Sequence, residues 1–275
     1  MLTRAQITIQ DGIVLLTLIP PKGKPPSLDP ALLDQMECWF DALAAAPDEV
    51  ELNGVGIDGS MTLRIHPRAL VICSAVERWF CAGANIMLLE TMTEESIGSW
   101  VRRGSAVFQK LAELPIPTIA KVDGYTLGGG LELAMACDFI VAGESAVLGQ
   151  TEAKLGFIPG WGATSRLPAR VGGPKAKQLF FTGAMIDAAS AAAIGLVDQV
   201  APSAKLDDTI AEMIDGIVAN SSVAIAAFKR ILSSTPGNWR EVMEAEARES
   251  VACVAASDTR MRLFEFLNRR NTTKS

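Results

Sequence analysis

Residues 123–138 of the chain read DGYTLGGGLELAMACD, and this stretch decides the fold that we predict. Its three consecutive glycines, Gly128 to Gly130, lead into an apolar segment that favours a helix. Each glycine costs a helix roughly 1 kcal/mol relative to alanine, so three of them at a helix start indicate a special requirement. Glycine has no Cβ, and another group can therefore approach its backbone closely. We expect a strand before the glycines, a tight turn at them and a helix across 129–137.

A single acid, Glu132, follows the glycines on an otherwise apolar turn. The first N–H groups of a helix lack partners within it, and the helix dipole makes them good donors to a developing negative charge. Glu132 comes three residues after Gly129, which on a helix puts both on one face. An N–H donor and a carboxylate could then serve one site. Two other interpretations stay open here: a purely structural turn, and a phosphate-binding turn that lacks the usual G-x-G-x-x-G spacing.

The composition narrows the classes of function. A net charge of −6 argues against nucleic acid as the main partner. Five cysteines without a CxxC pair predict neither a disulfide framework nor a zinc site, and we expect a reducing, cytoplasmic location. We also expect no signal peptide and no membrane span, because no apolar run approaches ~18 residues. The single histidine, His66, leaves acid–base chemistry to carboxylates or backbone groups.

Strand-like and helix-like segments alternate over the first two thirds of the chain, and helices dominate the last third. We expect a hairpin that turns at Asp11 and Gly12, a helix capped by Asp29, and a polar extended loop or hairpin over 47–69. A helix is expected near 94–113, where apolar residues recur at helical spacing: Ile97, Trp100, Val101, Val107, Phe108 and Leu111. Later helices are expected at 163–171, 174–181, 188–195, 204–219, 222–233, 239–256 and 258–269. This order predicts an α/β core over residues 1–200 and a helical region over 201–275.

Two further stretches could contribute to the same site. WFCAGANI, residues 79–86, leaves a buried strand through small residues that bring backbone N–H groups close to a ligand. GQTEAKLGFIPGWG, residues 149–162, carries Glu152 between glycines. A lone loop acid is usually solvated, but two acids beside one oxyanion site could position a water and transfer its proton.

Taken in this order and spacing, the stretches resemble the crotonase (enoyl-CoA hydratase/isomerase) superfamily. The resemblance runs over nearly the whole chain, from IVLLTLIPPKGKPPSL through PTIAKVDGYTLGGGLELAMACD to FLNRR. It implies an α/β crotonase (ClpP-like) fold, in which a spiral core of ββα turns forms two near-perpendicular sheets and a C-terminal helical region forms trimers. It also implies a homo-oligomer, a trimer or hexamer, that acts on an acyl-CoA or acyl-carrier-protein thioester without a metal or separate cofactor.

Position by position, the resemblance implies that the N–H groups of Ala82 and Gly129 hold the thioester oxygen. Glu132 and Glu152 match the two acids that hydratases of this family use together, which favours hydration of a 2-enoyl thioester or the reverse dehydration. The resemblance places the coenzyme A phosphates near Lys22. Further substrate contacts are implied at Ala84, Asn85, Ile86, Gly128, Gly160 and Trp161.

The sequence departs from the family pattern in three places. Asn85 stands where aspartate is usual, the first loop lacks the usual asparagine, and the segment 47–69 is longer than the norm. Other crotonase reactions, such as isomerisation or dehydration on a carrier protein, stay open. So does a non-catalytic acyl-CoA-binding protein, although such a protein has no need to keep both acids.

Overall fold

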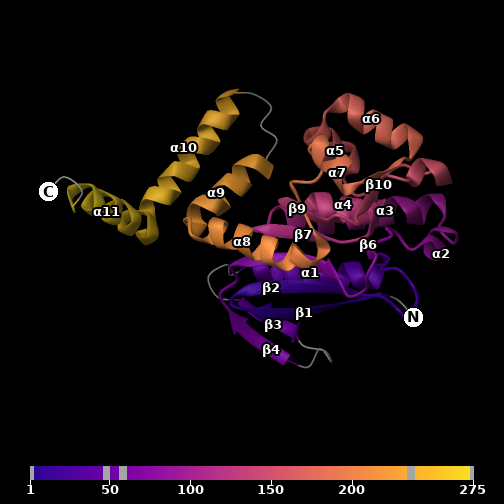
Figure 1. Ribbon diagram of the computed structural model, residues 1–275, viewed down its shortest axis with the longest axis horizontal. Helices are drawn as coiled ribbons and strands as arrows, with labels where there is room; N and C mark the ends of the chain where they lie inside the picture. Colours follow the sequence, from indigo (N-terminus) through magenta and orange to yellow (C-terminus); the bar gives the residue numbers. More distant parts are fainter. Residues whose placement is uncertain (1–2, 46–49, 56–60, 234–238, 273–275) are drawn as a thin grey trace.

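The computed structural model describes residues 3–45, 50–55, 61–233 and 239–272 (Figure 1). Two β-sheets form its centre, and helices cover them. The larger sheet has eight strands in the order β12-β9-β7-β5-β2-β1-β3-β4. These strands are β1 (Arg4–Gln10), β2 (Ile13–Ile19), β3 (Val50–Val55), β4 (Met61–Ile65), β5 (Ala69–Ser74), β7 (Thr118–Val122), β9 (Phe139–Gly143) and β12 (Gln199–Ala201).

The first two strands form the hairpin that the sequence predicts. β1 and β2 pair antiparallel, with Gln10 opposite Ile13. The turn residues Asp11 and Gly12 both have positive φ, at 52° and 78°. Two-residue turns of this kind match the twist of the flanking strands, and an Asp-Gly pair adopts them readily.

Parallel strands β2, β5, β7, β9 and β12 continue the sheet, and both of its faces are buried. On β5, Leu70 and Ile72 contribute to the main core, whereas Ala69 and Val71 join a second cluster. α8 (Leu206–Val218) covers that second cluster with its buried face. This arrangement explains why β5 reads as a continuous apolar run rather than an alternating one.

The smaller sheet has four strands in the order β11-β10-β8-β6. They are β6 (Trp79–Cys81), β8 (Tyr125–Leu127), β10 (Val147–Gly149) and β11 (Met185–Asp187). These short strands were not expected individually from the sequence. β6, β8 and β10 run parallel, so the segments that follow them leave the same edge of the sheet. The segments after β6, β8 and β10 are those that carry the candidate site residues.

The predicted helices are present, with bounds that shift by one or a few residues. The helices of the core are α1 (Pro30–Ala45), α2 (Ile86–Leu89), α3 (Glu94–Ala112), α4 (Gly129–Ala136), α5 (Ala163–Val171), α6 (Gly173–Thr182) and α7 (Ala188–Ala193), with the short 3₁₀ turns η1 (Glu152–Leu155) and η2 (Ser203–Lys205). As predicted, Asp29 caps α1, where its Oδ1 accepts the N–H of Leu32 at 3.0 Å.

The C-terminal helices lead away from this body. After α8, the chain forms α9 (Ser222–Ser233), α10 (Trp239–Ala255) and α11 (Ser257–Thr272). Figure 1 shows α10 and α11 projecting to one side, with the C-terminus at their far end. No single described helix has the length and apolarity of a membrane span, although Ser203–Val218 and Ser222–Ser233, bent by 100°, meet that criterion as a pair.

The segment 47–69 is a hairpin where the structure describes it. β3 and β4 pair antiparallel, and β3 adds to the sheet parallel to β1. Residues 47–49 and 56–60 of this segment lie outside the described chain. The hairpin extends the edge of the larger sheet and does not line the cavity described next.

Candidate active site

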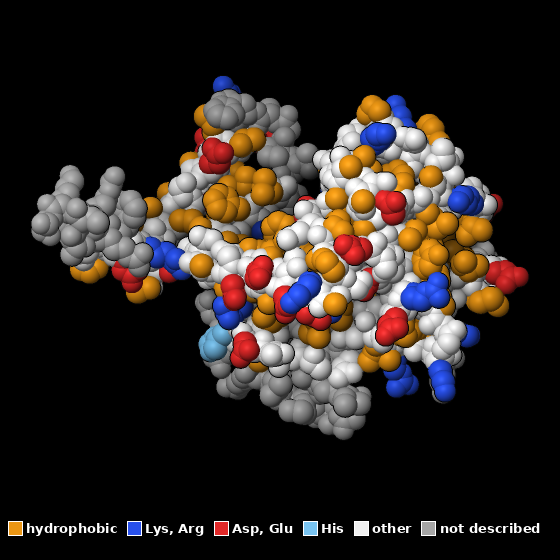
Figure 2. All heavy atoms as spheres, viewed as in Figure 1, with side chains coloured by type: hydrophobic (Ala, Val, Ile, Leu, Met, Phe, Trp, Pro, Cys, Tyr) orange, Lys and Arg blue, Asp and Glu red, His pale blue; other side chains and the backbone are white. Residues whose placement is uncertain are grey.

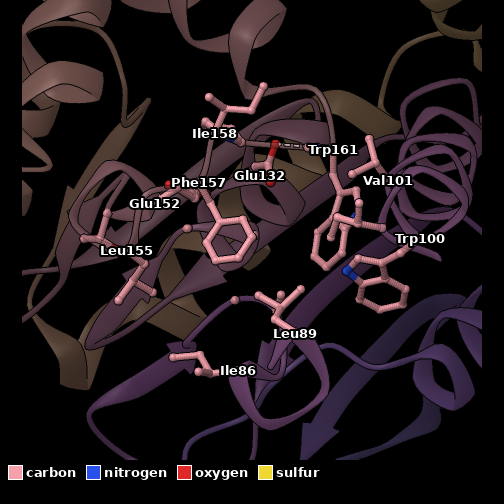
Figure 3. Close-up of a pocket in the computed structure, with 18 of the residues that line it drawn as sticks. Ile86, Leu89, Trp100, Val101, Glu132, Glu152, Leu155, Phe157, Ile158 and Trp161 are labelled. Carbon is pink, nitrogen blue, oxygen red and sulfur yellow. Dashed lines mark hydrogen bonds between the residues drawn. The ribbon is translucent and has the colours of Figure 1, made fainter. Parts of the chain in front are cut away.

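A cavity of about 220 Å³ lies where the segments after β6, β8 and β10 meet α2 and α3. Figure 3 shows its apolar side chains converging on the space beneath Glu132, with Trp100 and Trp161 at one end and Leu155 at the other. The lining consists of Ala82, Gly83, Ala84, Ile86, Leu89, Ile97, Trp100, Val101, Gly128, Gly129, Glu132, Thr151, Glu152, Leu155, Phe157, Ile158, Pro159, Gly160 and Trp161. The sequence prediction that the three stretches share one site is therefore met by the geometry.

Glu132 is held on a helix that is buried on every side. All residues of α4 are buried, and Glu132 is 2% exposed. Its Oε1 accepts the backbone N–H groups of Trp161 at 2.7 Å and Ala163 at 3.0 Å. Burial raises the pKa of Glu132, while the N–H groups of Ala163 and Trp161 oppose that rise by favouring the charged form. The carboxylate is thus fixed in place and sensitive to any further negative charge.

Glu152 approaches the cavity from the opposite side, at the start of η1. A Cβ on Gly128 would lie 3.1 Å from its Oε1, so the glycine makes room for this carboxylate. The Gln150 amide nitrogen, when it faces Glu152, lies 2.9 Å from both carboxylate oxygens. Burial, together with the smaller effect of the nearby Glu132 charge, raises the pKa of Glu152 to about 7. Near neutral pH both protonation states of Glu152 are populated.

The N–H groups around the cavity correct one prediction. The amide of Ala82 donates to the carbonyl of Pro26 at 2.8 Å, so it is occupied within the protein. The prediction that Ala82 supplies an oxyanion donor is wrong for that reason. Within the described chain, the amides of Ala84 and Gly129 donate to no acceptor. The Ala84 nitrogen lies 3.4 Å from where a Cβ on Gly129 would be, so the two free amides are close together.

Glycine is required where these amides meet. Gly83 has a φ of +96°, and a Cβ there would lie 2.9 Å from both the Gly129 nitrogen and the Leu127 carbonyl. Gly128 also has a positive φ, of 51°. A side chain at Gly83 would collide with the backbone that forms the site, and one at Gly128 would meet the Glu152 carboxylate, which explains why the sequence has glycine at both positions.

The other predicted contacts divide into two groups. Gly128, Gly160, Trp161, Ala84 and Ile86 line the cavity. Asn85 and Lys22 are not among its described lining residues. Asn85 instead caps α2, where its Oδ1 accepts the Met87 N–H at 3.1 Å, so asparagine supplies the capping bond that this turn needs.

Sequence reasoning missed the apolar end of the cavity. Trp100 and Val101 were read only as marks of helical spacing on α3, and Phe157 was not singled out. Phe108 packs edge-on against the Trp161 ring at 5.5 Å, as Trp100 does at 5.0 Å. The helical period shows which face of α3 is buried, but it carries no signal that the buried face borders a ligand cavity.

Arg166 was also missed, although it supports the turn that binds Glu132. Its Nη1 donates to the Trp161 carbonyl at 3.0 Å, and its Nη2 donates to Gln109 Oε1 at 3.0 Å. A Cβ on Gly162 would lie 2.0 Å from Arg166 Nη1, so this glycine, with φ +112°, lets the guanidinium pass. Among the described residues, no cluster of three or more His, Cys, Asp or Glu side chains could hold a metal ion.

Comparison with known proteins agrees with this geometry. The family model described as enoyl-CoA hydratase/isomerase matches residues 64–273. The chain is 37% identical over 205 residues to a short-chain-enoyl-CoA hydratase of Clostridium acetobutylicum, covering 74% of this chain and 78% of the relative. It is 46% identical over 133 residues to human mitochondrial methylglutaconyl-CoA hydratase. It is also 46% identical over 131 residues to mouse enoyl-CoA hydratase domain-containing protein 2.

Those last two matches each cover 48% of this chain and less than half of the relative's length, 39% and 44%. Solved structures match over much more of the chain. An enoyl-CoA hydratase from Bacillus anthracis superposes with a TM-score of 0.83 at 28% identity, covering 97% of this chain and 96% of that one. One from Thermoplasma volcanium superposes with a TM-score of 0.80 at 26% identity, covering 95% and 96%.

Proposed function

Because the chain belongs to the enoyl-CoA hydratase/isomerase family, we propose that it is a hydro-lyase that adds water to a 2-enoyl-CoA thioester. The observation that carries this proposal is that one cavity brings together two acids and two amides that have no acceptor in the described part of the chain. The relatives named as hydratases support the same reaction. Dehydration, the reverse reaction, uses the same groups.

The amides of Ala84 and Gly129 hold the thioester oxygen in this proposal. When water adds at C3, negative charge develops on that oxygen, and two fixed N–H groups stabilise it more strongly than they stabilise the neutral carbonyl. Gly129 is the first residue of α4, so the helix dipole acts in the same sense. Ala84 replaces Ala82, which the sequence had suggested, because only Ala84 has its N–H available among the two.

Glu132 and Glu152 handle the water and its proton. One ionised carboxylate accepts a proton from the attacking water while the oxygen bonds to C3, and one protonated carboxyl gives a proton to C2. The raised pKa of both acids, with Glu152 at about 7, keeps one proton shared between them near neutral pH. No proton is gained or lost over the cycle, and coenzyme A enters and leaves as part of the substrate.

The acyl chain in this proposal carries no charge. Among the described residues that line the cavity, none is Lys, Arg or His, and the acids already there would repel a second carboxylate. A methylglutaconyl chain, which the human relative's name specifies, bears such a carboxylate. We therefore place this protein with hydratases of apolar acyl chains.

Two parts of the proposal concern groups outside the cavity. Lys22 lies exposed on the loop after β2, where a solvated ammonium group can meet the phosphates of coenzyme A. A homo-oligomer, trimer or hexamer, is proposed through the C-terminal helices. Figure 2 shows hydrophobic side chains gathered over α9 and α10. Exposed apolar residues of these helices include Phe228 and Leu232 on α9 and Val251 and Val254 on α10.

The direct test is to add the protein to crotonyl-CoA and follow the absorbance of the conjugated thioester. Hydration removes the conjugation, so the proposal predicts a steady loss of that absorbance. Binding of crotonyl-CoA without any loss would contradict the proposal and favour a binding protein. Activity confined to 3-enoyl-CoA, which gains conjugation when it isomerises, would replace the proposal with an isomerase.

A further inference from the structure

We infer that Trp161 limits the length of the acyl chain, because this residue lies between the active-site cavity and a second cavity behind it. This inference rests on the proposed function, since it concerns the chain carried by the thioester. The enzyme it describes acts on short 2-enoyl chains. A smaller residue at this position would connect the two cavities into one path for a longer chain.

The two cavities meet at Trp161. The second one has a volume of about 410 Å³ and is formed by residues of α3, α5 and the end of α9. Among the described residues, Trp161 is the one that lines both cavities. Trp161 therefore borders the active-site cavity on one side and this second space on the other.

The active-site cavity by itself is small. Its volume of about 220 Å³ is below the ≈ 300–1,000 Å³ of typical small-molecule pockets, and it must hold both the water and the carbons beyond the thioester. At the end opposite Trp161 stand Ile86 and Leu155, which are exposed to solvent. A long chain would have to turn back toward that end and lose contact with apolar surface.

The ring of Trp161 is held firmly, so it acts as a wall rather than a mobile gate. It is 3% exposed and packs edge-on against Trp100 and Phe108. A Cβ on Gly104 would lie 2.2 Å from its Nε1, and one on Gly129 would lie 2.5 Å from its ring. The indole thus occupies a slot between two glycines, one of them in the middle of α3.

The fit of this slot has a cost that smaller side chains would not carry. Trp161 Nε1 is buried and has no hydrogen-bond partner in the described part of the chain. Leaving a buried donor without a partner is unfavourable, and a glycine inside a helix is unfavourable as well. An alanine at 161 would bring no unpartnered N–H group and would not require a glycine inside α3. We therefore attribute to the indole the role of closing the cavity.

The experiment compares kcat/KM for crotonyl-CoA, 2-hexenoyl-CoA and 2-decenoyl-CoA in the wild-type protein and in Trp161→Ala. We expect the wild-type value to fall as the chain lengthens. In Trp161→Ala, we expect the ratio of kcat/KM for 2-decenoyl-CoA to that for crotonyl-CoA to rise by at least tenfold. Each methylene that enters the opened space should contribute about fourfold to this ratio, and a few methylenes should enter it. Trp161→Leu keeps an apolar filling, opens the wall partly, and provides the test if Trp161→Ala does not fold.

A second substitution tests where the longer chain goes. Ala169 lies on α5, is exposed, and lines the second cavity but not the first. Ala169→Phe alone should leave the chain-length profile of the wild type unchanged. Combined with the opened variant at 161, it should cancel the gain for 2-decenoyl-CoA, because the ring fills the space that the chain would enter.

The results separate this inference from the proposed function. If wild-type protein hydrates 2-decenoyl-CoA as well as crotonyl-CoA, or if the opened variants leave the ratio unchanged, the inference is overturned while the hydratase function stands. If Ala169→Phe fails to cancel the gain, the chain does not use the second cavity and the inference is again overturned. If no enoyl-CoA is hydrated, the function fails, and calorimetric binding of butyryl-CoA against decanoyl-CoA still tests the wall without turnover.

Discussion

Glu132 and Glu152 occupy one cavity but differ in how the protein holds them. Glu132 is almost fully buried and accepts two backbone N–H groups, whereas Glu152 is half-buried on a 3₁₀ turn with a pKa of about 7. The same residue type therefore serves as a fixed acceptor in one place and as a titrating acid in the other. This division underlies the first two predictions.

Glu152→Gln should lower kcat for crotonyl-CoA hydration by roughly 10²–10⁴-fold, because the amide can neither take up nor release the proton. The affinity for coenzyme A should stay near that of the wild type, since Glu152 borders the acyl cavity. The matched control is Glu144→Gln, an exposed glutamate outside the cavity, which should keep full activity. A fully active Glu152→Gln would remove this acid from the mechanism.

The raised pKa of Glu152 also predicts how stability depends on pH. The folded protein holds this proton up to about pH 7, the pKa of Glu152, whereas the unfolded chain releases it near the ordinary glutamate pKa of 4.5. The contribution of Glu152 to stability is therefore present at low pH and is lost as the pH rises between these values. Denaturant titrations of Glu152→Gln should lack this decline and show a more stable protein than the wild type at pH 8. Parallel pH profiles for the two proteins would contradict the pKa assignment.

At the residue scale, the structure places Glu132, Glu152 and Gly129 on one cavity, as the sequence predicts, but the N–H of Ala82 is already used. Ala82 and Ala84 flank Gly83, and nothing in WFCAGANI indicates which of their two N–H groups already donates to another part of the protein. That depends on Pro26, which lies in a distant loop and accepts the N–H of Ala82. Pairing of this kind is set by tertiary structure and has no local signal.

At the element scale, α3 shows how one helix serves both the core and the site. Its buried residues Trp100, Val107, Phe108 and Leu111 recur at helical spacing, which is why the sequence predicts it. The structure adds that Gly104 on this helix faces Trp161. The helix thus carries two glycines, Gly98 and Gly104, in different surroundings.

Gly104→Ala and Gly98→Ala should have opposite effects on the free energy of unfolding. A Cβ at Gly104 would lie 2.2 Å from Trp161 Nε1, and overpacking of this kind costs about 1–3 kcal/mol. A Cβ at Gly98 has its nearest neighbour, Arg102 Nη1, at 3.5 Å, so alanine there should stabilise by up to about 1 kcal/mol. Urea denaturation measures both. A Gly104→Ala protein as stable as Gly98→Ala would mean that Trp161 is not fixed in this slot.

At the scale of the whole molecule, the sequence predicted the order of strands and helices along the chain but not the strands of the second, four-stranded sheet. The alternation of strands and helices, followed by helices alone, predicts an α/β core with a helical C-terminus, and the structure has both. The four-stranded sheet was not expected strand by strand, because β6, β8, β10 and β11 have three residues each and are too short to show a period. Those short strands are what bring the distant site segments together.

The projecting helices lead to a prediction about assembly. Phe264 on α11 is 68% exposed, and Phe181 on α6 is 78% exposed. If the C-terminal helices join the subunits, Phe264→Asp should sediment as smaller species than the wild type. The control is Phe181→Asp, on α6, which should leave the association through the C-terminal helices intact. Equal sedimentation of Phe264→Asp and wild type, at concentrations where the wild type self-associates, would exclude this residue from the contact.

The most direct measurement of the central claim is a crystal structure with acetoacetyl-CoA, a thioester that cannot be hydrated as an enoyl chain. We predict that its thioester oxygen lies about 2.7–3.1 Å from the amide nitrogens of both Ala84 and Gly129, with C3 facing Glu152. A thioester oxygen bound to neither amide, or a C3 turned away from both acids, would contradict it.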